Sequence, residues 1–562
     1  MAVLRHQRLL AVCLAALLCA VSQACAIEFD PNTMLRTAEI RAGMTGVCKT
    51  VLKGTTIEEF PVEIIGVLEK TWNGGDIILF RITGGPLFEK KIGILSGMSG
   101  SPVYINGKLA GAISLSFDVM MREPMGGATP IEQMIQPSAA PALPQQATLL
   151  KAPRPLMLAG RPVTQFLLAP LGSPVKPTHS TPVLRPVATP LFVSGVRPEQ
   201  LAALRPLVES YGFRLYPGPG QSSTPVQAPL EPGAALGVAF CLGDISAASV
   251  GTVTYRQGDE VLAFGHPMMG TGPCGLPMTA AWVHGYVESS WDPFKLSSPA
   301  QIVGTLTGDH AWSIAGRLDL QPPTMPVNLA VSNAETGVSK HFAVEVCQDK
   351  TLTPLGLLIA LQEAASGVGR QAGATTWVSK IALRAQGLEP IRRRVAFSTG
   401  SFGLFSFPAA YQLTGVVMEM LMLLASNPWE TPDILSMELE TEMVDQDRAS
   451  TIVRAETDRL IYRPGETVKV AVVVQPLNGK RYVETFSLPL PKELPDGPGS
   501  VLVFGGMFGP YLGGDGLLPP AIDDLPGFLD WYQTLDAEND LVAVIAYPTA
   551  GVTFPEGQLK DL

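Results

Sequence analysis

The sequence is poor in charge and in histidine. Of its 562 residues, 16% are Asp, Glu, Lys or Arg, and only six are histidines. The net charge is −10, and no basic stripe offers itself to phosphates, which argues against a nucleic-acid-binding protein. No His-Glu-x-x-His motif occurs, and no paired histidines share a helical spacing. We therefore disfavour metal-dependent hydrolysis and predict no metal or other cofactor.

Cysteine is also scarce outside the first residues. Three of the seven cysteines fall within residues 1–26, and the remaining four are Cys48, Cys241, Cys274 and Cys347. Four cysteines allow three full pairings, and the sequence does not choose among them. Buried free thiols are the equal alternative. No pair has the close spacing of a zinc site.

Long apolar runs are missing after the N-terminus. The run from Leu9 to Val21 follows a basic start and is too short to span a bilayer comfortably. Ala24-Cys25-Ala26 fits a small-x-small cleavage site, so residues 1–26 are predicted to be a signal peptide, with a mature start near Ile27. A lipid anchor on Cys25 is the alternative, although Ser22-Gln23 makes a poor lipobox.

The other apolar helix candidate, residues 408–425, contains Gln412 and Glu419 and is typical of a core helix. We therefore expect a bacterial protein that is exported to the periplasm or the extracellular space. We expect no transmembrane span in its mature chain.

Glycine and proline are plentiful, with 56 and 50 residues, and they favour strands and turns over a helical bundle. Composition and strand-like runs predict six segments: 1–26, signal peptide; 27–134, a first β-rich unit; 135–232, a Pro/Ala-rich connector; 233–435, a second β-rich unit with appended helices; 436–505, a β-sandwich-like domain; and 506–562, a Gly/Pro-rich end. Near the end of the first unit, Thr129 is predicted to cap a short helix.

One turn in the first unit has the features of a nucleophile site. Ser99 lies in Gly97-Met98-Ser99-Gly100-Ser101-Pro102, directly before two apolar runs that Asn106-Gly107 joins into a predicted hairpin. Glycines on both sides let the backbone adopt conformations that other residues avoid. Such a turn can present a hydroxyl and aim amides at one point, as acyl transfer requires. The alternative is a simple loop.

One histidine differs from the others. His6 and His179 lie in the signal peptide and the connector, and His284, His310 and His341 have no obvious partners. His266 instead follows a strand end, in Ala263-Phe264-Gly265-His266-Pro267, which places its imidazole at a loop mouth. This is a normal position for a general base.

Together, these two segments resemble the SpoIVB-type serine peptidases. The shared features are Gly97 to Pro102 with Asn106-Gly107-Lys108-Leu109, the strand from Gly251 to Tyr255 with Phe264-Gly265-His266, and the later segments Val303 to Leu306 and Ile314 to Gly316. The resemblance covers about residues 35–134 and 233–335.

The resemblance implies a mainly β fold. A trypsin-like double β-barrel would be split by the Pro-rich connector and followed by the β-sandwich-like domain. Ser99 would be the nucleophile and His266 its general base, with the amides of Gly97 and Ser99 forming the oxyanion hole. In the family, the histidine half precedes the serine half, so the order in this chain is similar to a circular permutation.

The family's acidic triad residue has no counterpart at the matching place, where this chain has Gly84 after Thr83. Asp76 is the nearest upstream acid, and Asp118, Asp244 or Asp259 are alternatives from elsewhere in the chain. Losing the orienting carboxylate typically reduces the rate by about 10⁴.

Two functions therefore follow from the resemblance. The first is an exported serine endopeptidase that cleaves protein or peptide substrates through an acyl-enzyme. The alternative is a catalytically impaired, peptidase-derived binding or scaffold protein of the cell envelope, whose C-terminal β domain would contact a protein partner. A carboxylate near His266 would favour the first.

Overall fold

The computed structural model describes two compact units. It covers residues 27–560 except 72–73, 118–123, 137–145, 159, 179, 221–224, 227–228, 290–291, 369–373, 399–408, 495, 507–521, 547–550 and 555–556. Unit 1 extends to Thr324 and includes Cys347–Thr353, and unit 2 holds Met325–Val346 and the chain from Pro354 onward. The predicted signal peptide, Asp118 and His179 lie outside the described residues.

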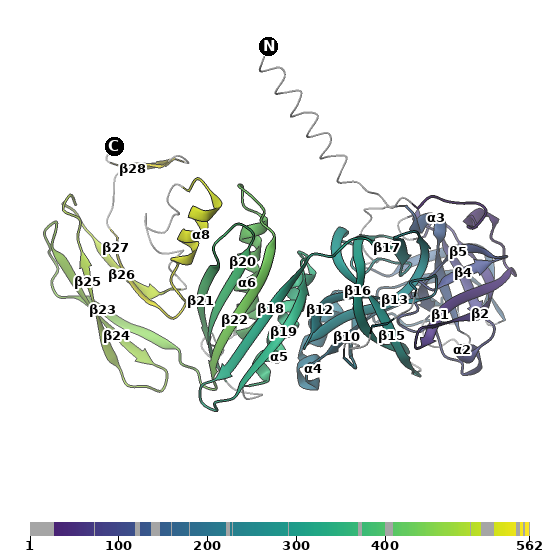
Figure 1. Ribbon diagram of the computed structural model, residues 1–562, viewed down its shortest axis with the longest axis horizontal. Helices are drawn as coiled ribbons and strands as arrows, with labels where there is room; N and C mark the ends of the chain where they lie inside the picture. Colours follow the sequence, from purple (N-terminus) through teal and green to yellow (C-terminus); the bar gives the residue numbers. More distant parts are fainter. Residues whose placement is uncertain are drawn as a thin grey trace, which may run out of the picture. The chain divides into compact units, whose positions relative to one another are not determined.

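The first half of unit 1 is a closed, six-stranded antiparallel barrel, here called barrel 1 (Figure 1). Its strands in ring order are β4 (Pro102–Ile105), β1 (Thr45–Lys53), β2 (Thr56–Leu68), β3 (Ile77–Ile82), β6 (Met125–Pro130) and β5 (Lys108–Phe117), and β5 pairs again with β4. Apolar residues alternate inward and fill the barrel, with Phe60, Ile78 and Phe80 almost fully buried. The short helices α2 (Pro86–Glu89) and α3 (Ile131–Met134) join or follow these strands, and the 3₁₀ turn η1 (Thr37–Glu39) precedes them.

The second half of unit 1 repeats this architecture as barrel 2. Its ring is β13 (Ser246–Gln257), β14 (Glu260–Ala263), β17 (Ser313–Arg317), β16 (Phe294–His310), β15 (Gly272–Val287) and β12 (Ala235–Gly243), and β12 closes antiparallel on β13. The barrels lie side by side in Figure 1, barrel 1 in purple to blue and barrel 2 in teal. The predicted mainly β, double-barrel fold is therefore confirmed.

The chain between the barrels is more regular than its composition indicated. It forms β7 (Thr148–Leu158), β8 (Arg161–Leu168) and β9 (Val183–Pro186), which extend the sheet of barrel 1 beyond β5. It then forms β10 (Thr189–Ser194), α4 (Pro198–Ser210) and β11 (Phe213–Pro217), which extend barrel 2 beyond β13. Pro153 and Pro155 fall in edge strand β7 where its register with β8 shifts, a place where a missing N–H is tolerated.

Unit 2 contains a five-stranded mixed sheet. Its order is β19 (Ser339–Cys347), β18 (Thr324–Asn333), β22 (Ile434–Val444), β20 (Thr376–Ala385) and β21 (Ile391–Ser398). Two largely apolar helices accompany it, α5 (Leu352–Ser366) and α6 (Ala409–Ala425), and α6 contacts β20 and β21.

A β-sandwich completes unit 2. The strands β23 (Ser450–Thr457), β24 (Thr467–Pro476) and β25 (Tyr482–Pro489) form one sheet, and β26 (Ser500–Gly505) and β27 (Leu541–Ala546) form the other. Val468, Val470 and Val472 pack against side chains of both sheets. The sandwich thus draws β27 from beyond the predicted range of 436–505. The hairpin β28 (Gly551–Phe554) and β29 (Gly557–Lys560) follows.

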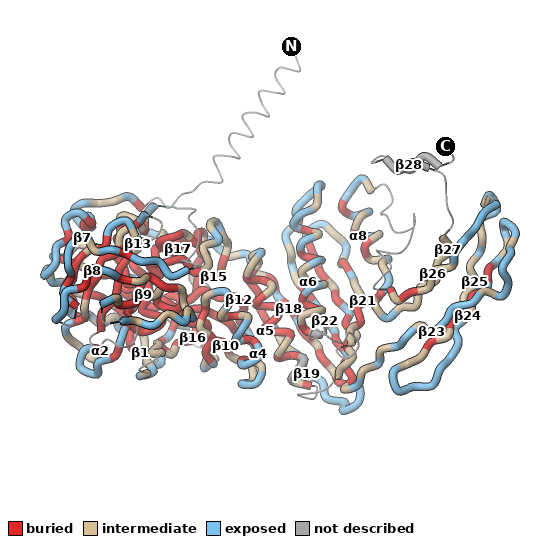
Figure 2. The backbone as a smooth tube through the Cα atoms, turned by 180° about the vertical axis from the view of Figure 1, so that it is seen from behind, coloured by how far each residue is buried: buried red, intermediate tan, exposed pale blue. Residues whose placement is uncertain are grey.

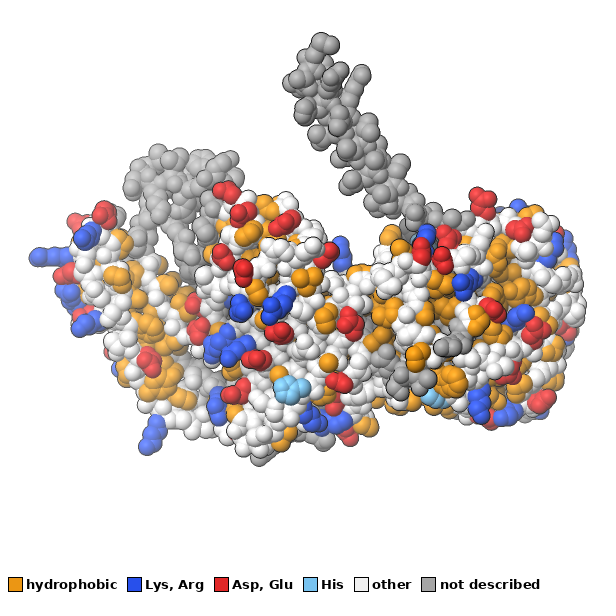
Figure 3. Space-filling model, in the orientation of Figure 1, with side chains coloured by type: hydrophobic (Ala, Val, Ile, Leu, Met, Phe, Trp, Pro, Cys, Tyr) orange, Lys and Arg blue, Asp and Glu red, His pale blue; other side chains and the backbone are white. Residues whose placement is uncertain are grey.

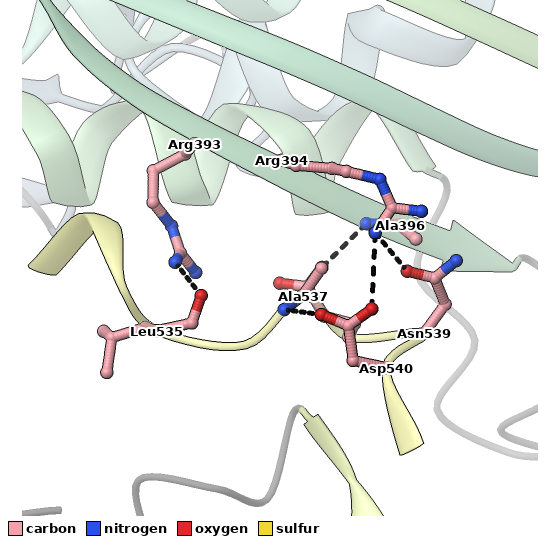
Figure 4. Close-up of polar contacts among 8 residues, drawn as sticks. Arg393, Arg394, Ala396, Leu535, Ala537, Asn539 and Asp540 are labelled. Atoms are coloured by element: carbon pink, nitrogen blue, oxygen red, sulfur yellow. Dashed lines mark hydrogen bonds and ion pairs between the residues drawn. The ribbon is translucent and has the colours of Figure 1, made fainter. Parts of the chain in front are cut away.

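A polar seam attaches helix α8 (Leu525–Gln533) and the segment after it to β21 (Figure 4). Arg393 donates to the carbonyl of Leu535 at 2.7 Å, and Arg394 donates to Asn539 at 3.0 Å. The amide of Ala396 donates to the Glu538 carboxylate at 2.7 Å. The arginine run of β21 is therefore engaged in internal contacts.

Burial is concentrated in the barrels and in the mixed sheet, as the red tube of Figure 2 shows, while the outer strands of the sandwich are largely exposed. On the face drawn in Figure 3, acidic and basic side chains are interspersed. Cys48, Cys241, Cys274 and Cys347 are free thiols. Among the described residues, no helix is both long and apolar enough to cross a membrane.

Candidate active site

The turn that carries Ser99 connects Ser96 to strand β4. Gly97 and Gly100 have φ of +94° and +88°, a region in which a side chain is disfavoured. The predicted hairpin follows, with Asn106 and Gly107 both at positive φ. Ser99 is fully buried, and its Oγ has no hydrogen-bond partner among the described residues.

Backbone hydrogen bonds set the direction of the amides in this turn. The Ser96 carbonyl accepts from the Lys295 amide at 3.0 Å, and the Met98 carbonyl accepts from the Ser101 amide at 2.9 Å. In a trans peptide the N–H points opposite to the C=O, so the amides of Gly97 and Ser99 point away from these donors. Within the described part of the chain, neither amide has an acceptor. Two N–H groups of the turn are thus available to a negatively charged oxygen.

Barrel 2 holds this turn from behind. The Thr252 amide donates to the Ser99 carbonyl at 2.9 Å, and its hydroxyl donates to the Gly97 carbonyl at 3.0 Å. The Thr254 hydroxyl donates to the Gly100 carbonyl at 2.7 Å. A Cβ on Gly100 would lie 2.4 Å from the Phe264 amide nitrogen, so only glycine permits this approach of the two chains.

His266 follows β14 in the loop that approaches Gly100. Phe264 and Gly265 both have φ of +67°, which turns the chain sharply after the strand. The Gly265 carbonyl accepts from the Thr129 hydroxyl of barrel 1 at 2.6 Å. Thr129 therefore does not cap helix α3, whose N-cap is Pro130 without a side-chain bond, and instead ties the histidine loop to barrel 1.

The ring of His266 is 3% exposed and has a defined tautomer. Its Nδ1 lies 2.7 Å from the Pro267 carbonyl oxygen. Because a carbonyl can only accept, Nδ1 carries the proton and Nε2 has a free lone pair. Nε2 has no partner among the described residues. Burial lowers the pKa of His266 to about 4, so the ring is neutral at physiological pH.

No described carboxylate contacts either ring nitrogen of His266. Gly84 has no room for the family's acid, because a Cβ there would lie 2.8 Å from Pro61 Cγ. Asp76 accepts from the Lys70 amide within its own loop. The site therefore has a backbone carbonyl where a triad has a carboxylate.

Asp309 stabilises the loop that follows His266. Its carboxylate accepts from the amides of Met268, Met269 and Gly270, each at 2.7 Å, and from Thr271 at 3.4 Å. Burial raises the pKa of Asp309, and these four amide donors act against the rise. Asp309 thus fixes residues 268–271, which directly follow Pro267, the residue whose carbonyl orients the His266 ring.

The remaining histidines belong to other surroundings. His284 Nε2 contacts the Ser298 hydroxyl at 2.9 Å, and half-buried His310 ends β16. His341 lies in β19 of unit 2. Among the described residues, no group of three His, Cys, Asp or Glu side chains is placed to hold a metal ion.

The segment that carries Ser99 is similar to a known peptidase family. Residues 23–135 match the family model of the SpoIVB peptidase S55. This match confirms the predicted resemblance to the SpoIVB-type family, and it covers barrel 1 with Ser99 but ends before His266. No curated protein and no solved structure gives a match to this chain.

The sequence did not reveal several residues that shape the Ser99 turn and the neighbouring His266 loop. Thr252, Thr254 and Asp309 act through hydrogen bonds that depend on the pairing of the barrels. A signal existed for Asp309, which is a charged residue near the end of a long, mostly buried strand. The Pro267 carbonyl carries no signal in the sequence, because every residue has a carbonyl group.

Proposed function

We propose that this protein is an exported serine endopeptidase of the SpoIVB type that acts through an acyl-enzyme at Ser99. The observation that carries the proposal is that the Ser99 turn and the His266 loop meet between the two barrels. Ser99 Oγ and His266 Nε2 are both buried, and neither is hydrogen-bonded to the other or to another described group. A buried polar atom without a partner is costly and calls for an explanation, and a catalytic role is one such explanation.

In the proposed reaction, Ser99 Oγ attacks the scissile carbonyl carbon and transfers its proton to His266 Nε2. The amides of Gly97 and Ser99 donate to the oxyanion of the tetrahedral intermediate. The imidazolium then gives its proton to the leaving amine as the C–N bond breaks. Water hydrolyses the resulting acyl-enzyme by the same route, which regenerates Ser99.

The Pro267 carbonyl takes part of the role of a triad carboxylate. It holds the tautomer in which Nε2 accepts a proton, which is the orienting task of the acid. It has no full negative charge with which to stabilise the imidazolium. We therefore expect a slow peptidase, and the low pKa of His266, about 4, agrees with a weak base.

Substrate access requires local opening, because Ser99 is 0% and His266 3% exposed. This burial and the missing carboxylate favour a second candidate function. In that case the double barrel and the sandwich of unit 2 bind a protein partner of the cell envelope without cleaving it.

Labelling with a fluorophosphonate separates the two functions. Purified protein is incubated with the probe, and modification of Ser99 is located by mass spectrometry of its peptide. We expect slow labelling of the wild type and none of Ser99→Ala. Ser249→Ala is the matched control, because Ser249 is equally buried with an unpartnered hydroxyl in barrel 2. An unlabelled wild type with intact thermal unfolding would support the binding function instead.

A further inference from the structure

Lys295, near the start of β16, is a buried lysine that the proposed reaction does not use. Its side chain is 1% exposed, although lysine is among the residues least often buried. Within the described part of the chain, no carboxylate forms an ion pair with it. A buried amine without a counter-ion is expensive and calls for an explanation.

The amine of Lys295 lies among hydroxyl groups from both barrels. Nζ donates to Thr50 Oγ1 on β1 at 2.6 Å and to Thr252 Oγ1 on β13 at 3.3 Å. The Ser101 hydroxyl also donates to Thr50 Oγ1, at 2.9 Å. Lys295, Thr50, Ser101 and Thr252, here called the lysine cluster, are all buried.

Each member of the lysine cluster also touches the Ser99 turn. Thr252 holds the carbonyls of Gly97 and Ser99, and Ser101 belongs to the turn itself. The amide of Lys295 holds the Ser96 carbonyl, which directs the Gly97 amide. The stem of Lys295 lies against Gly97, since a Cβ on that glycine would be 3.4 Å from the lysine Cβ.

We propose that Lys295 is a positioning residue for Ser99, whose ammonium group fixes the turn through Thr50 and Thr252 and brings positive charge behind the Gly97 and Ser99 amides. The inference rests on the proposed peptidase function. A chain of hydrogen bonds runs from Nζ through Thr252 Oγ1 to the Gly97 carbonyl, and such chains polarise one another in a low dielectric. A preorganised positive charge stabilises an oxyanion most where water is excluded.

The charge on Lys295 changes within the physiological range. Burial lowers its pKa to about 7, and the groups that act against this are Cys48 on β1 and Glu58 on β2. Cys48 is a neutral thiol at this pH, because burial raises its pKa to about 12. The ammonium form is therefore lost as the pH rises through about 7, and the oxyanion support is lost with it.

The test measures the rate of Ser99 modification by the fluorophosphonate from pH 4 to 10. We expect the wild-type rate to rise as His266 loses its proton near pH 4 and to fall above pH 7. In Lys295→Met, the labelling rate at pH 6 should be about one tenth of the wild-type rate or lower. The fall in rate above pH 7 should disappear. Thr50→Val should lie between the two. Lys53→Met is the control for loss of a lysine, since Lys53 is exposed at the end of β1, the strand that carries Thr50.

Thermal unfolding separates positioning from a merely structural role. Removing a buried, unpaired amine in favour of an apolar chain of similar length should leave Lys295→Met as stable as the wild type or more stable. If the wild type is labelled and Lys295→Met has the same rate and pH profile, the proposed role of Lys295 is overturned and the peptidase function is not. A rate loss that only parallels a loss of stability would also overturn it. A wild type that is not labelled at all would overturn the peptidase function, and the role of Lys295 with it.

Discussion

The two barrels of unit 1 have the same strand pattern but make different contributions to the candidate site. Barrel 1 contributes one turn, with Ser99 and two amides that have no acceptor among the described residues. Barrel 2 contributes His266 and also Thr252, Thr254 and Lys295, which shape the turn of barrel 1. In the other direction, the Thr129 hydroxyl of barrel 1 donates a hydrogen bond to the histidine loop. The part of the chain that matches the SpoIVB peptidase family model thus contains Ser99, the proposed nucleophile, whereas Thr252, Lys295 and the proposed base His266 lie outside it.

The barrels differ in ionisable groups as well. Residues 27–134 contain no histidine, whereas barrel 2 contains His266, His284 and His310. Substitutions at these groups and at the contact between the barrels therefore test what each barrel contributes to the site.

His266→Gln should have the largest effect. Loss of the general base should reduce Ser99 labelling by about 10²–10⁴-fold while the fold is retained. His284→Gln, in the same barrel, should leave the rate unchanged because the His284 ring is hydrogen-bonded to Ser298 on β16 and not to a group of the candidate site. Rates from quenched time courses test this. Equal labelling rates for His266→Gln and the wild type would contradict the proposal that barrel 2 supplies the general base.

Gly100→Ala should separate the barrels at the site. Its Cβ would lie 2.0 Å from the Thr252 carbonyl oxygen, in addition to the strain of a positive φ. We expect the free energy of unfolding to fall by about 3 kcal/mol and labelling to be lost. Gly107→Ala has the same strain with nothing within 4 Å, and should cost about 1 kcal/mol. Urea unfolding of both variants measures the difference, and equal losses would contradict the close approach.

Acid should destabilise the protein through barrel 2. The pKa of His266 is lowered in the folded state from 6.5 to about 4, so the unfolded chain binds more protons in this range. Stability is complete above pH 6.5 and falls as the pH drops toward 4, by about 3 kcal/mol. Urea midpoints at pH 7, 5.5 and 4.5 measure the slope. The slope should be smaller in His266→Gln, and an identical slope would contradict the buried neutral ring.

Asp309→Asn should have a smaller effect. The amide replaces one acceptor oxygen with a donor that faces backbone N–H groups of residues 268–271. We expect a loss of about 1–3 kcal/mol in unfolding free energy and slower labelling of Ser99. Exposed Asp319→Asn serves as the control and should change stability by less than about 1 kcal/mol. A thermal melt of each variant gives the comparison.

Local sequence patterns predicted much of this fold. The Asn106-Gly107 hairpin is present, and α6 starts one residue after the predicted helix of 408–425. These features depend on turn chemistry and periodicity, which are local. The predicted domain boundaries and the circular permutation stay predictions.

Long-range pairing explains what the sequence did not predict. The proline-rich stretch forms β7 to β11 because β5 and β13 each run beyond one of their barrel partners and pair there with β9 and β10. Composition cannot show where a strand outruns its partner. Thr129 was expected to cap a helix, but its hydroxyl instead donates to the Gly265 carbonyl of the other barrel. The lysine cluster likewise joins residues up to 245 positions apart, so no local pattern marks it.

The hydrogen bonds from barrel 2 to the Ser99 turn have a consequence for folding during synthesis. Thr252 lies 155 positions after the glycine whose carbonyl it holds, and Lys295 comes later still. A ribosome releases the serine long before the residues that shape its surroundings. A growing chain therefore carries Ser99 in a turn that lacks these hydrogen bonds, and the turn is complete only after both barrels have been made and have met.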